Sequence, residues 1–294
     1  MGKVTSRSIM NFIKNGIRIF GFLLLFGIFA HGMELDFKLS GGYAYLDVKD
    51  VNRGITDWTE WRIKEAEQNK NWIMLGQNLD NLNSGIHLEG EILFTLSSRF
   101  GISIGTGYIY SDISEKEVEV LVYKGTEPLS QIHITTASAY PLVLTAYYFL
   151  PLNSRLKLYV RGGGGVAWAN YVNREAKKLE SAEKYNYFQL DKASASGSIF
   201  LGGLGFIYKT EVGVRFFVEG LLRMAKIQGF SGENELEETG KLYYFEEYNS
   251  QLDFWQAKNE IRTEKPSGSN FRSVSETIVD FSGFSFKIGF IIRF

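Results

Sequence analysis

The sequence predicts an all-β fold: an antiparallel up-and-down transmembrane β-barrel of about eight strands with long extracellular loops. Three observations predict it. Apolar and polar residues alternate up to the last residue, strand-like segments are separated by alternately short and long spacers, and the amino terminus is of secretory type. Only alternate residues of a barrel strand must be apolar, which explains why the overall composition is only moderately hydrophobic.

The carboxy-terminal segment shows the alternation most clearly. One face of this strand would carry large apolar side chains, namely Phe284, Phe286, Ile288, Phe290, Ile292 and Phe294. The other face would carry Ser285, Lys287, Gly289 and Arg293. A strand with lipid on one side and a polar lumen on the other needs this pattern.

The amino terminus has the layout of a secretory signal peptide. Basic residues up to Arg18 precede the apolar run Ile19–Ala30, and small residues follow near Gly32. The run is shorter than the roughly 20 residues that a spanning helix needs. We expect residues 1–32 to be removed, leaving a barrel domain of residues 33–294; a retained amphipathic anchor is the alternative.

The net charge and the cysteine content limit which partners and cross-links are expected. A formal net charge of −1 gives no sign of a nucleic-acid partner. The chain has no cysteine, so no disulfide framework is expected, although this alone excludes little.

Eight segments have the length and composition of membrane-crossing strands. They are Leu35–Val48, Ser84–Leu96, Arg99–Asp112, Ile132–Leu150, Arg155–Asn170, Ala193–Tyr208, Val212–Ile227 and Ile278–Phe294. An even number of strands closes the sheet, which is necessary because lipid offers no partner for a free sheet edge. Both termini then lie on the side of the short turns, which we expect to be periplasmic.

The spacers alternate between tight turns and long excursions. The turns are expected at residues 97–98, 151–154 and 209–211, and the excursions at residues 49–83, 113–131, 171–192 and 228–277. Because each segment exceeds the ~9–11 residues needed to cross, the wall should continue beyond the membrane. Val118, Val120 and Val122 alternate with Glu117 and Glu119 before a turn at residues 124–126, which predicts a hairpin there.

The same alternation assigns a lumen face and a lipid face to three further strands. Lumen-facing residues are His87, Glu89, Glu91, Thr95, Lys157, Tyr159, Arg161, Arg215, Glu219 and Arg223. Lipid-facing residues are Ile86, Leu88, Ile92, Phe94, Leu96, Leu156, Leu158, Val160, Val166, Trp168, Val214, Phe216, Val218, Leu222 and Met224. The strand around Pro141 is apolar on both faces, and Pro141 is a candidate bulge. The run Gly162–Gly165 suits a place where bulky lumen side chains need room.

The signal peptide, the eight-strand rhythm, the strands "RFGISIGTGYIY" and "LKLYVRGGGGVAWA" and the closing "FSFKIGFIIRF" resemble small outer-membrane β-barrel proteins of the OmpA transmembrane-domain, OmpX and OmpW kinds. The resemblance covers nearly the whole mature chain, and its motifs are architectural. It implies an outer membrane of Gram-negative type, containing lipopolysaccharide. It also implies insertion by the barrel assembly machinery, with Phe290, Ile292 and Phe294 in the assembly signal. It carries over no catalytic residue.

The lumen-facing charges form the candidate site: Glu89, Glu91, Arg161, Arg215, Glu219, Arg223 and Lys287. Counting up from the short turns puts Glu219 and Lys287 at similar heights on neighbouring strands, so we expect them to pair. Glu89, Glu91 and Arg161 should lie at comparable depth. An eight-stranded barrel is just wide enough for side chains to fill it, which predicts a paired plug; a gated ion or proton path is the alternative.

His133 and Thr135 raise a second alternative, an enzyme that modifies lipid A. Lipid A deacylases are barrels of similar size with an outward-facing His, Ser and Glu set. Here His133 and Thr135 lie two residues apart near the outer rim, and His87 also lies near that rim. Thr replaces the expected Ser, and one His with one Thr does not establish a nucleophile and its base. Rim histidines satisfied by water or by aromatic neighbours are the simpler interpretation.

The long excursions are rich in aromatic residues, which supply contact area for a ligand or partner or pack on one another. These residues are Trp58, Trp61, Trp72, Tyr243, Tyr244, Phe245, Tyr248, Phe254 and Trp255. Glu175–Lys184 has helical propensity and is a candidate loop helix. The acidic excursion 228–277 is a candidate for recruiting divalent cations near lipopolysaccharide, but no ligand spacing of the calcium-loop type is present, and no cofactor is expected. The sequence therefore predicts a non-enzymatic, monomeric barrel with a structural or surface-interaction role; a narrow conduit for small solutes is the alternative.

Overall fold

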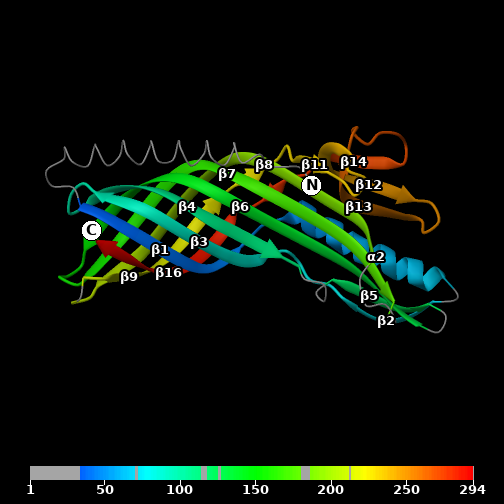
Figure 1. The fold of residues 1–294 in the computed structure, drawn as a ribbon, viewed down its shortest axis with the longest axis horizontal. Helices are drawn as coiled ribbons and strands as arrows, with labels where there is room; N and C mark the ends of the chain where they lie inside the picture. Colours follow the sequence, from blue (N-terminus) through cyan, green and yellow to red (C-terminus); the bar gives the residue numbers. More distant parts are fainter. Residues whose placement is uncertain are drawn as a thin grey trace.

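Eight antiparallel strands form a closed ring. The computed structural model describes residues 34–69, 72–113, 118–124, 127–179, 186–211 and 213–293, so the expected signal peptide lies outside the described residues. In order around the barrel, the ring strands are β1 (Glu34–Tyr45), β3 (Ser84–Thr95), β4 (Phe100–Asp112), β6 (Glu127–Pro151), β7 (Leu156–Leu179), β8 (Asn186–Lys209), β9 (Arg215–Met224) and β16 (Gly283–Arg293). Pairing of β16 with β1 closes the ring, which confirms the predicted fold (Figure 1).

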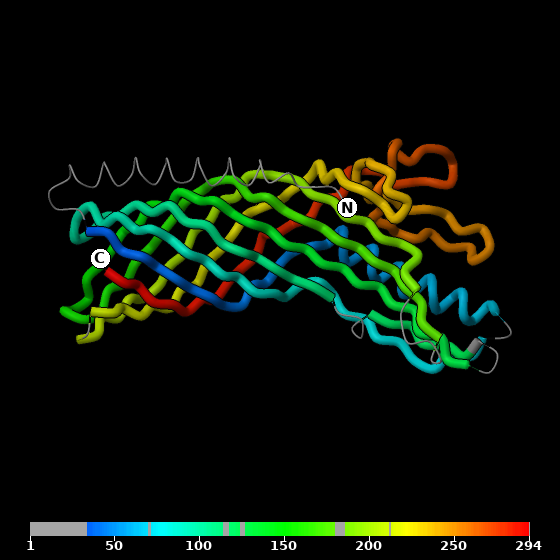
Figure 2. The backbone as a smooth tube through the Cα atoms, viewed as in Figure 1, coloured from blue at the N-terminus to red at the C-terminus, as the bar shows by residue number. Residues whose placement is uncertain are grey.

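The three short turns and both ends of the ring lie together. The turns between β3 and β4, β6 and β7, and β8 and β9 fall where the sequence predicts them. The start of β1 and the end of β16 lie at this same end of the molecule, hereafter the turn end (Figure 2).

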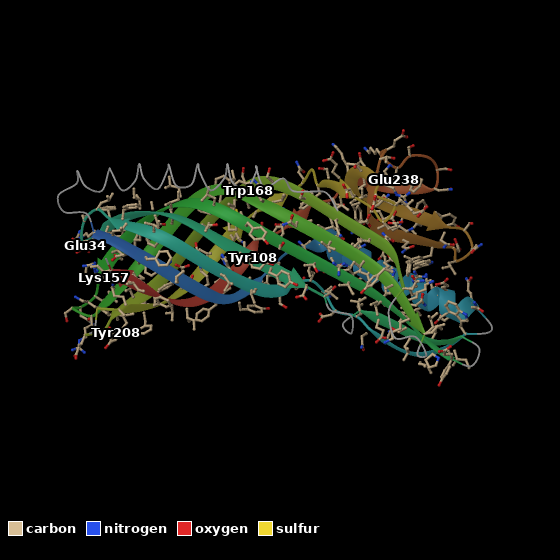
Figure 3. All side chains as sticks on the ribbon, viewed as in Figure 1. Glu34, Tyr108, Lys157, Trp168, Tyr208 and Glu238 are labelled. Carbon is tan, nitrogen blue, oxygen red and sulfur yellow. The ribbon has the colours of Figure 1, made fainter. Side chains whose placement is uncertain are left out.

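The ring wall faces lipid on its outside. On β16, Phe284, Phe286 and Ile288 are 44%, 52% and 61% exposed, whereas Ser285 and Lys287 are fully buried. Aromatic side chains gather at two levels. Tyr108 and Trp168 lie midway along the molecule and Tyr208 lies near the turn end (Figure 3). Two such aromatic levels, with aliphatic residues between them, form the girdles of a transmembrane barrel.

Beyond the upper aromatic level, β6, β7 and β8 continue past the other ring strands and acquire new neighbours. The added strands are β2 (Trp72–Asn78), β5 (Glu119–Lys124), β11 (Ser231–Glu233), β12 (Thr239–Asn249), β13 (Phe254–Arg262) and β14 (Phe271–Glu276). They pair in the order β2-β5-β6 on one side and β8-β11-β12 on the other, with β13 and β14 beside β12. Two-residue strands β10 (Lys226–Ile227) and β15 (Val279–Asp280) pair separately. The predicted extension of the wall and the hairpin of β5 with β6 are present; residues 125–126 lie outside the described part.

A helix fills the mouth of this extension. Helix α2 (Lys49–Gln68) packs against β13, β2 and β5, so it lies between the two sheet edges (Figure 1). Val51, Ile55 and Trp58 recur at helical spacing and are buried. We call α2, the added strands and the adjoining parts of β6, β7 and β8 the head. Among the described residues, no helix is both long and apolar enough to cross a bilayer.

Three local predictions are wrong. The excursion 49–83 contains α2 instead of being only a loop. Residues 175–179 extend β7, because pairing with β6 and β8 overrides their helical propensity; residues 180–185 lie outside the described part. Pro141 is not a bulge. The β6–β7 register runs through Pro141 unchanged, and the β4–β6 register is the same on both sides of it.

The glycine run in β7 has a different main reason from the one expected. A Cβ on Gly163 or Gly165 would clash with the carbonyl oxygens of Leu144 and Leu142, so these glycines mainly permit the close approach of β6. Gly163 also makes room for a lumen side chain, as expected, because its Cβ would lie 2.8 Å from the Thr145 hydroxyl.

Candidate functional site

Six buried charges meet in the centre of the barrel and balance one another. This central cluster comprises Lys38, Glu89, Glu91, Arg161, Glu219 and Lys287, which come from β1, β3, β7, β9 and β16. Each of the six residues is at most 9% exposed. Three cations facing three carboxylates leave the interior without net charge, which a low-dielectric site requires.

Arg161 lies at the centre of the cluster and contacts all three carboxylates. Its NH2 nitrogen lies 2.8 Å from Glu89 Oε2 and 2.7 Å from Glu219 Oε1, and its NH1 nitrogen lies 2.6 Å from Glu91 Oε1. One guanidinium thus bridges β3, β7 and β9 across the lumen, a role that suits its planar set of N–H donors.

The two lysines bridge the remaining oxygens. Lys38 Nζ lies 2.8 Å from Glu91 Oε1 and 3.0 Å from Glu219 Oε2. Lys287 Nζ lies 3.0 Å from Glu219 Oε1 and also pairs with Glu89. Each carboxylate therefore contacts at least two cations, so that loss of a single cation leaves none of the three wholly unpaired.

Hydroxyl groups complete the coordination of the carboxylates. Tyr159 donates a hydrogen bond of 2.6 Å to Glu219, Ser103 donates one of 2.7 Å to Glu91, and Tyr147 also donates to Glu91. Glycines make the room: a Cβ on Gly105 would lie 2.7 Å from Glu91 Cγ, and one on Gly205 would lie 2.7 Å from the Tyr159 hydroxyl. The cluster is thus packed as well as paired.

Apolar layers lie on both sides of the central cluster. Toward the turn end lie Leu93, Phe149, Ile207, Phe217 and Ile291, together with the rings of Tyr147 and Tyr159. Toward the head a larger core includes Ile109, Ala139, Leu221 and Phe281 and continues onto α2. These side chains are buried, so the lumen is filled across its width on either side of the ion pairs.

The structure brings together most of the predicted lumen charges, but not all of them. Glu219 and Lys287 are neighbours in the β9–β16 register, as expected, and Glu89 and Glu91 both meet Arg161. Arg215 lies apart, paired with Asp36 near the turn end. Arg223 lies toward the head, where it donates 2.6 Å and 2.9 Å hydrogen bonds to the Phe281 carbonyl and the Ser285 hydroxyl.

Lys38 is a member that sequence reasoning missed. It alternates with Leu35, Phe37 and Leu39 in β1, so its lumen-facing position was readable from the sequence. Its partners were not readable, because they come from strands brought beside β1 only by ring closure. Of the expected assembly signal, Phe290 and Ile292 face outward on β16, and Phe294 lies outside the described residues.

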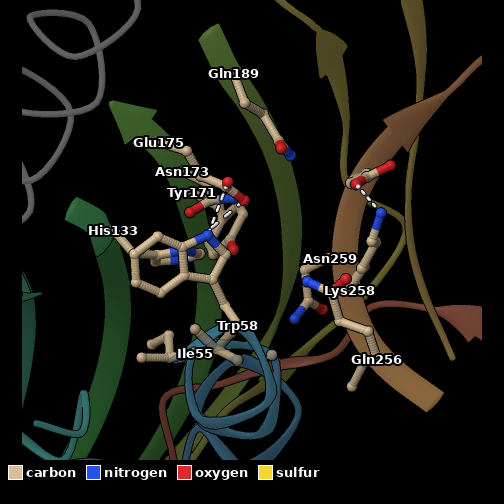
Figure 4. Close-up of a pocket in the computed structure, with 14 residues that line it drawn as sticks. Ile55, Trp58, His133, Tyr171, Asn173, Glu175, Gln189, Gln256, Lys258 and Asn259 are labelled. Atoms are coloured by element: carbon tan, nitrogen blue, oxygen red, sulfur yellow. Dashed lines mark hydrogen bonds and ion pairs between the residues drawn. The ribbon is translucent and has the colours of Figure 1, made fainter. Parts of the chain in front are cut away.

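The head contains a second polar site, a cavity of about 20 Å³ under α2 (Figure 4). Trp58 Nε1 donates a 2.8 Å hydrogen bond to Glu175, and Arg62 NH2 lies 3.4 Å from the same carboxylate. The cavity has room for about one water molecule. These contacts attach α2 to β7, so Glu175 is a main polar anchor of the helix.

His133 also lines this cavity and faces inward. Its ring meets the edge of Trp58 with centroids 5.2 Å apart, and its Nδ1 lies 3.9 Å from Glu175 Oε1. Burial, with Arg62 nearby, lowers the pKa of His133 to about 3. Thr135 donates to Asn173 at 3.2 Å. The outward-facing arrangement required by the lipid A deacylase alternative is therefore not present at His133 and Thr135. His87 is likewise buried, 3.1 Å from the Ser285 hydroxyl.

Asp191 of β8 makes the stability of the head depend on pH. It accepts hydrogen bonds of 3.0 Å from Gln189 and 3.2 Å from the backbone N–H of Ile261. Burial raises the pKa of Asp191 to about 7, well above the usual value for an aspartate. Between about pH 4 and pH 7 the folded head therefore holds a proton that the unfolded chain has released, and Asp191 costs the head stability as pH rises through this range.

We expect Asp191→Asn to raise the free energy of unfolding of the head at pH 8. This increase should shrink toward zero by pH 4. His133 has the opposite slope, because burial of its neutral ring costs stability below about pH 6.5, but the variant leaves His133 unchanged. The measurement is urea unfolding at pH 4, 6 and 8 by tryptophan fluorescence. Four of the five tryptophans, Trp58, Trp61, Trp72 and Trp255, report on the head. A gain that does not change with pH would contradict this assignment.

Comparison with known proteins adds little beyond the fold. No family model and no curated protein sequence matches this chain. Among solved structures, OprG from Pseudomonas aeruginosa is 15% identical with a TM-score of 0.39, covering 88% of this chain and 95% of OprG. Ail of Yersinia pestis, solved with the heparin analogue sucrose octasulfate, is 11% identical with a TM-score of 0.34, covering 89% and 99%. The outer membrane protease OmpT from Escherichia coli is 8% identical with a TM-score of 0.25, covering 89% and 96%.

OprG and OmpT are named as outer membrane proteins. At such identities and TM-scores the likeness says nothing about function, and the fold rests on the strand pairing described above.

Proposed function

We propose that this chain is an outer-membrane β-barrel whose lumen is sealed and whose head serves surface interaction rather than catalysis or transport. The observation that carries the proposal is the central cluster. Its six charges are buried, mutually paired and held between two apolar layers. An ion crossing this region would have to break several buried ion pairs at once, and separating a buried pair costs about 3–5 kcal/mol.

The head provides the surface for interaction. Strand β2 is at the edge of the head sheet, and its Ile73 and Leu75 are exposed, as is Leu79 just after it. Exposed apolar side chains on an edge strand above the membrane favour contact with another molecule. α2 holds the opposite side of the sheet in place, so the surface is presented on a rigid support.

The proposal includes the cellular setting implied by the resemblance. The mature chain would be a monomer in outer-membrane lipid and lipopolysaccharide. The barrel assembly machinery would insert it by reading the terminal strand with Phe290, Ile292 and Phe294. This setting rests on the outward apolar face of β16 and on the secretory character of residues 1–32.

Planar-bilayer recording of the purified full chain tests the sealed lumen. We expect no discrete conductance steps at ±100 mV in neutral salt, with a general porin in the same bilayers as the positive control. Stable, discrete channels in the unmodified protein would contradict the proposal and favour the narrow conduit.

A further inference from the structure

A vestibule opens at the turn end of the barrel, far from the head. It has a volume of about 660 Å³, within the range of small-ligand sites. Its wall includes Ser97, Ser98, Arg155, Lys157, Lys209 and Arg293. Lys157 and Glu34 mark this end of the molecule in Figure 3.

The vestibule carries an excess of positive charge. Five cationic side chains line it, namely Arg155, Lys157, Lys209, Arg215 and Arg293. The carboxylates that pair with them are Glu34, Asp36 and Glu211. The Arg155–Glu211 pair is exposed and contributes little. Among the described residues, no carboxylate lies within ion-pair distance of Lys157 or Lys209.

The position of Lys157 distinguishes this site from an ordinary solvated rim. Lys157 follows the inward alternation of β7 with Tyr159 and Arg161, and it is half-buried. Its Nζ lies 6.0 Å from the centre of the Phe149 ring, so it stands over the apolar layer that floors the vestibule. A half-buried ammonium over an apolar floor has lost part of its hydration, which an anionic ligand would replace.

We propose that the vestibule binds a phosphate-bearing anion. Lys157 and Lys209 form no ion pair with a carboxylate of the described residues, and the exposed partner of Arg155 is weakly held. Hydroxyls of Ser98 and Ser154 stand on the same wall as further donors. Ammonium, guanidinium and hydroxyl donors around one cavity are the groups that bind phosphate oxygens. The phosphate could belong to a soluble ligand or to a phospholipid headgroup.

Binding of inorganic pyrophosphate to the full chain in neutral detergent, followed by calorimetry, tests the site. We expect saturable binding that weakens at least about tenfold in the double variant Lys157→Gln/Lys209→Gln. Lys192→Gln/Lys226→Gln is the matched control, because both lysines are exposed and lie at the head end of the barrel, away from the vestibule. Unchanged gel mobility of unheated samples shows that all variants fold.

Repeating the titration in nanodiscs identifies the source of the phosphate. Pyrophosphate binding that is weaker in phosphatidylglycerol than in phosphatidylcholine discs, and stays weaker in salt that screens the bilayer charge, would show that an anionic headgroup occupies the vestibule. Equal binding in that salt would show a soluble ligand. The proposal is overturned if the unmodified protein binds no pyrophosphate saturably, or if the double variant and the control bind equally well.

Discussion

Arg161→Met is expected to lower the free energy of unfolding of the barrel by about 3–5 kcal/mol, the cost of leaving buried charge uncompensated. Removing the guanidinium leaves three carboxylates facing two lysines. It also takes away the group that links β3, β7 and β9 across the lumen. The measurement is urea unfolding in lipid vesicles, followed by the shift in gel mobility between folded and unfolded barrel.

Arg155→Met is the matched control for this substitution. Arg155 lies just before the same strand, and its pair with Glu211 is exposed, so its loss should cost no more than about 1 kcal/mol. Equal effects of the two substitutions would show that the central cluster adds nothing beyond a surface ion pair.

Trp58→Ala is expected to lower the free energy of unfolding of the head by about 3–5 kcal/mol while leaving the ring intact. Trp58 is 1% exposed and packs in the core between α2 and the sheet. Its loss would also leave the Glu175 carboxylate, already held in a buried site, without the indole N–H. Hydrogen exchange resolved by segment should show faster exchange in α2 and β13, with β9 and β16 unchanged.

Glu60→Ala on the exposed face of α2 controls for a general effect of mutating the helix. It should leave exchange in α2 within experimental error of the unmodified protein. If Trp58→Ala left α2 as protected as this control does, α2 would not be anchored by the contacts described here.

The sequence was most informative where side chains alternate between lipid and lumen. Phe284, Phe286 and Ile288 face outward and Ser285 and Lys287 face inward, because a period of two leaves a strand in lipid no other arrangement. The Glu219–Lys287 pairing followed from counting up from the turn end along β9 and β16, which pair in the closed ring. Local pattern and short-range geometry sufficed for these features.

The features that could not be predicted depend on contacts between distant parts of the chain. The apolar stripe of α2 is narrow and interrupted by charged residues, and its burial against β13 requires a partner about 200 residues away. Residues 175–179 favour a helix locally, yet Glu175 pairs with His133 and Gln189 in the sheet. Lys38 likewise acquires its role only when β1 meets both β3 and β16.

The direct test of the central claim is a spin-label scan along β16, which the absence of native cysteine makes possible. Single cysteines at positions 284, 285, 286, 288, 290 and 291 would be labelled in lipid vesicles and probed with oxygen and with a polar nickel reagent. Lys287 and Gly289 stay unchanged, because Lys287 belongs to the central cluster and a Cβ at position 289 would meet the Phe217 ring. A sealed barrel predicts that oxygen reaches the even positions, while positions 285 and 291 are shielded from both reagents. Free access of the nickel reagent at 285 and 291 would show a water-filled lumen and contradict the account.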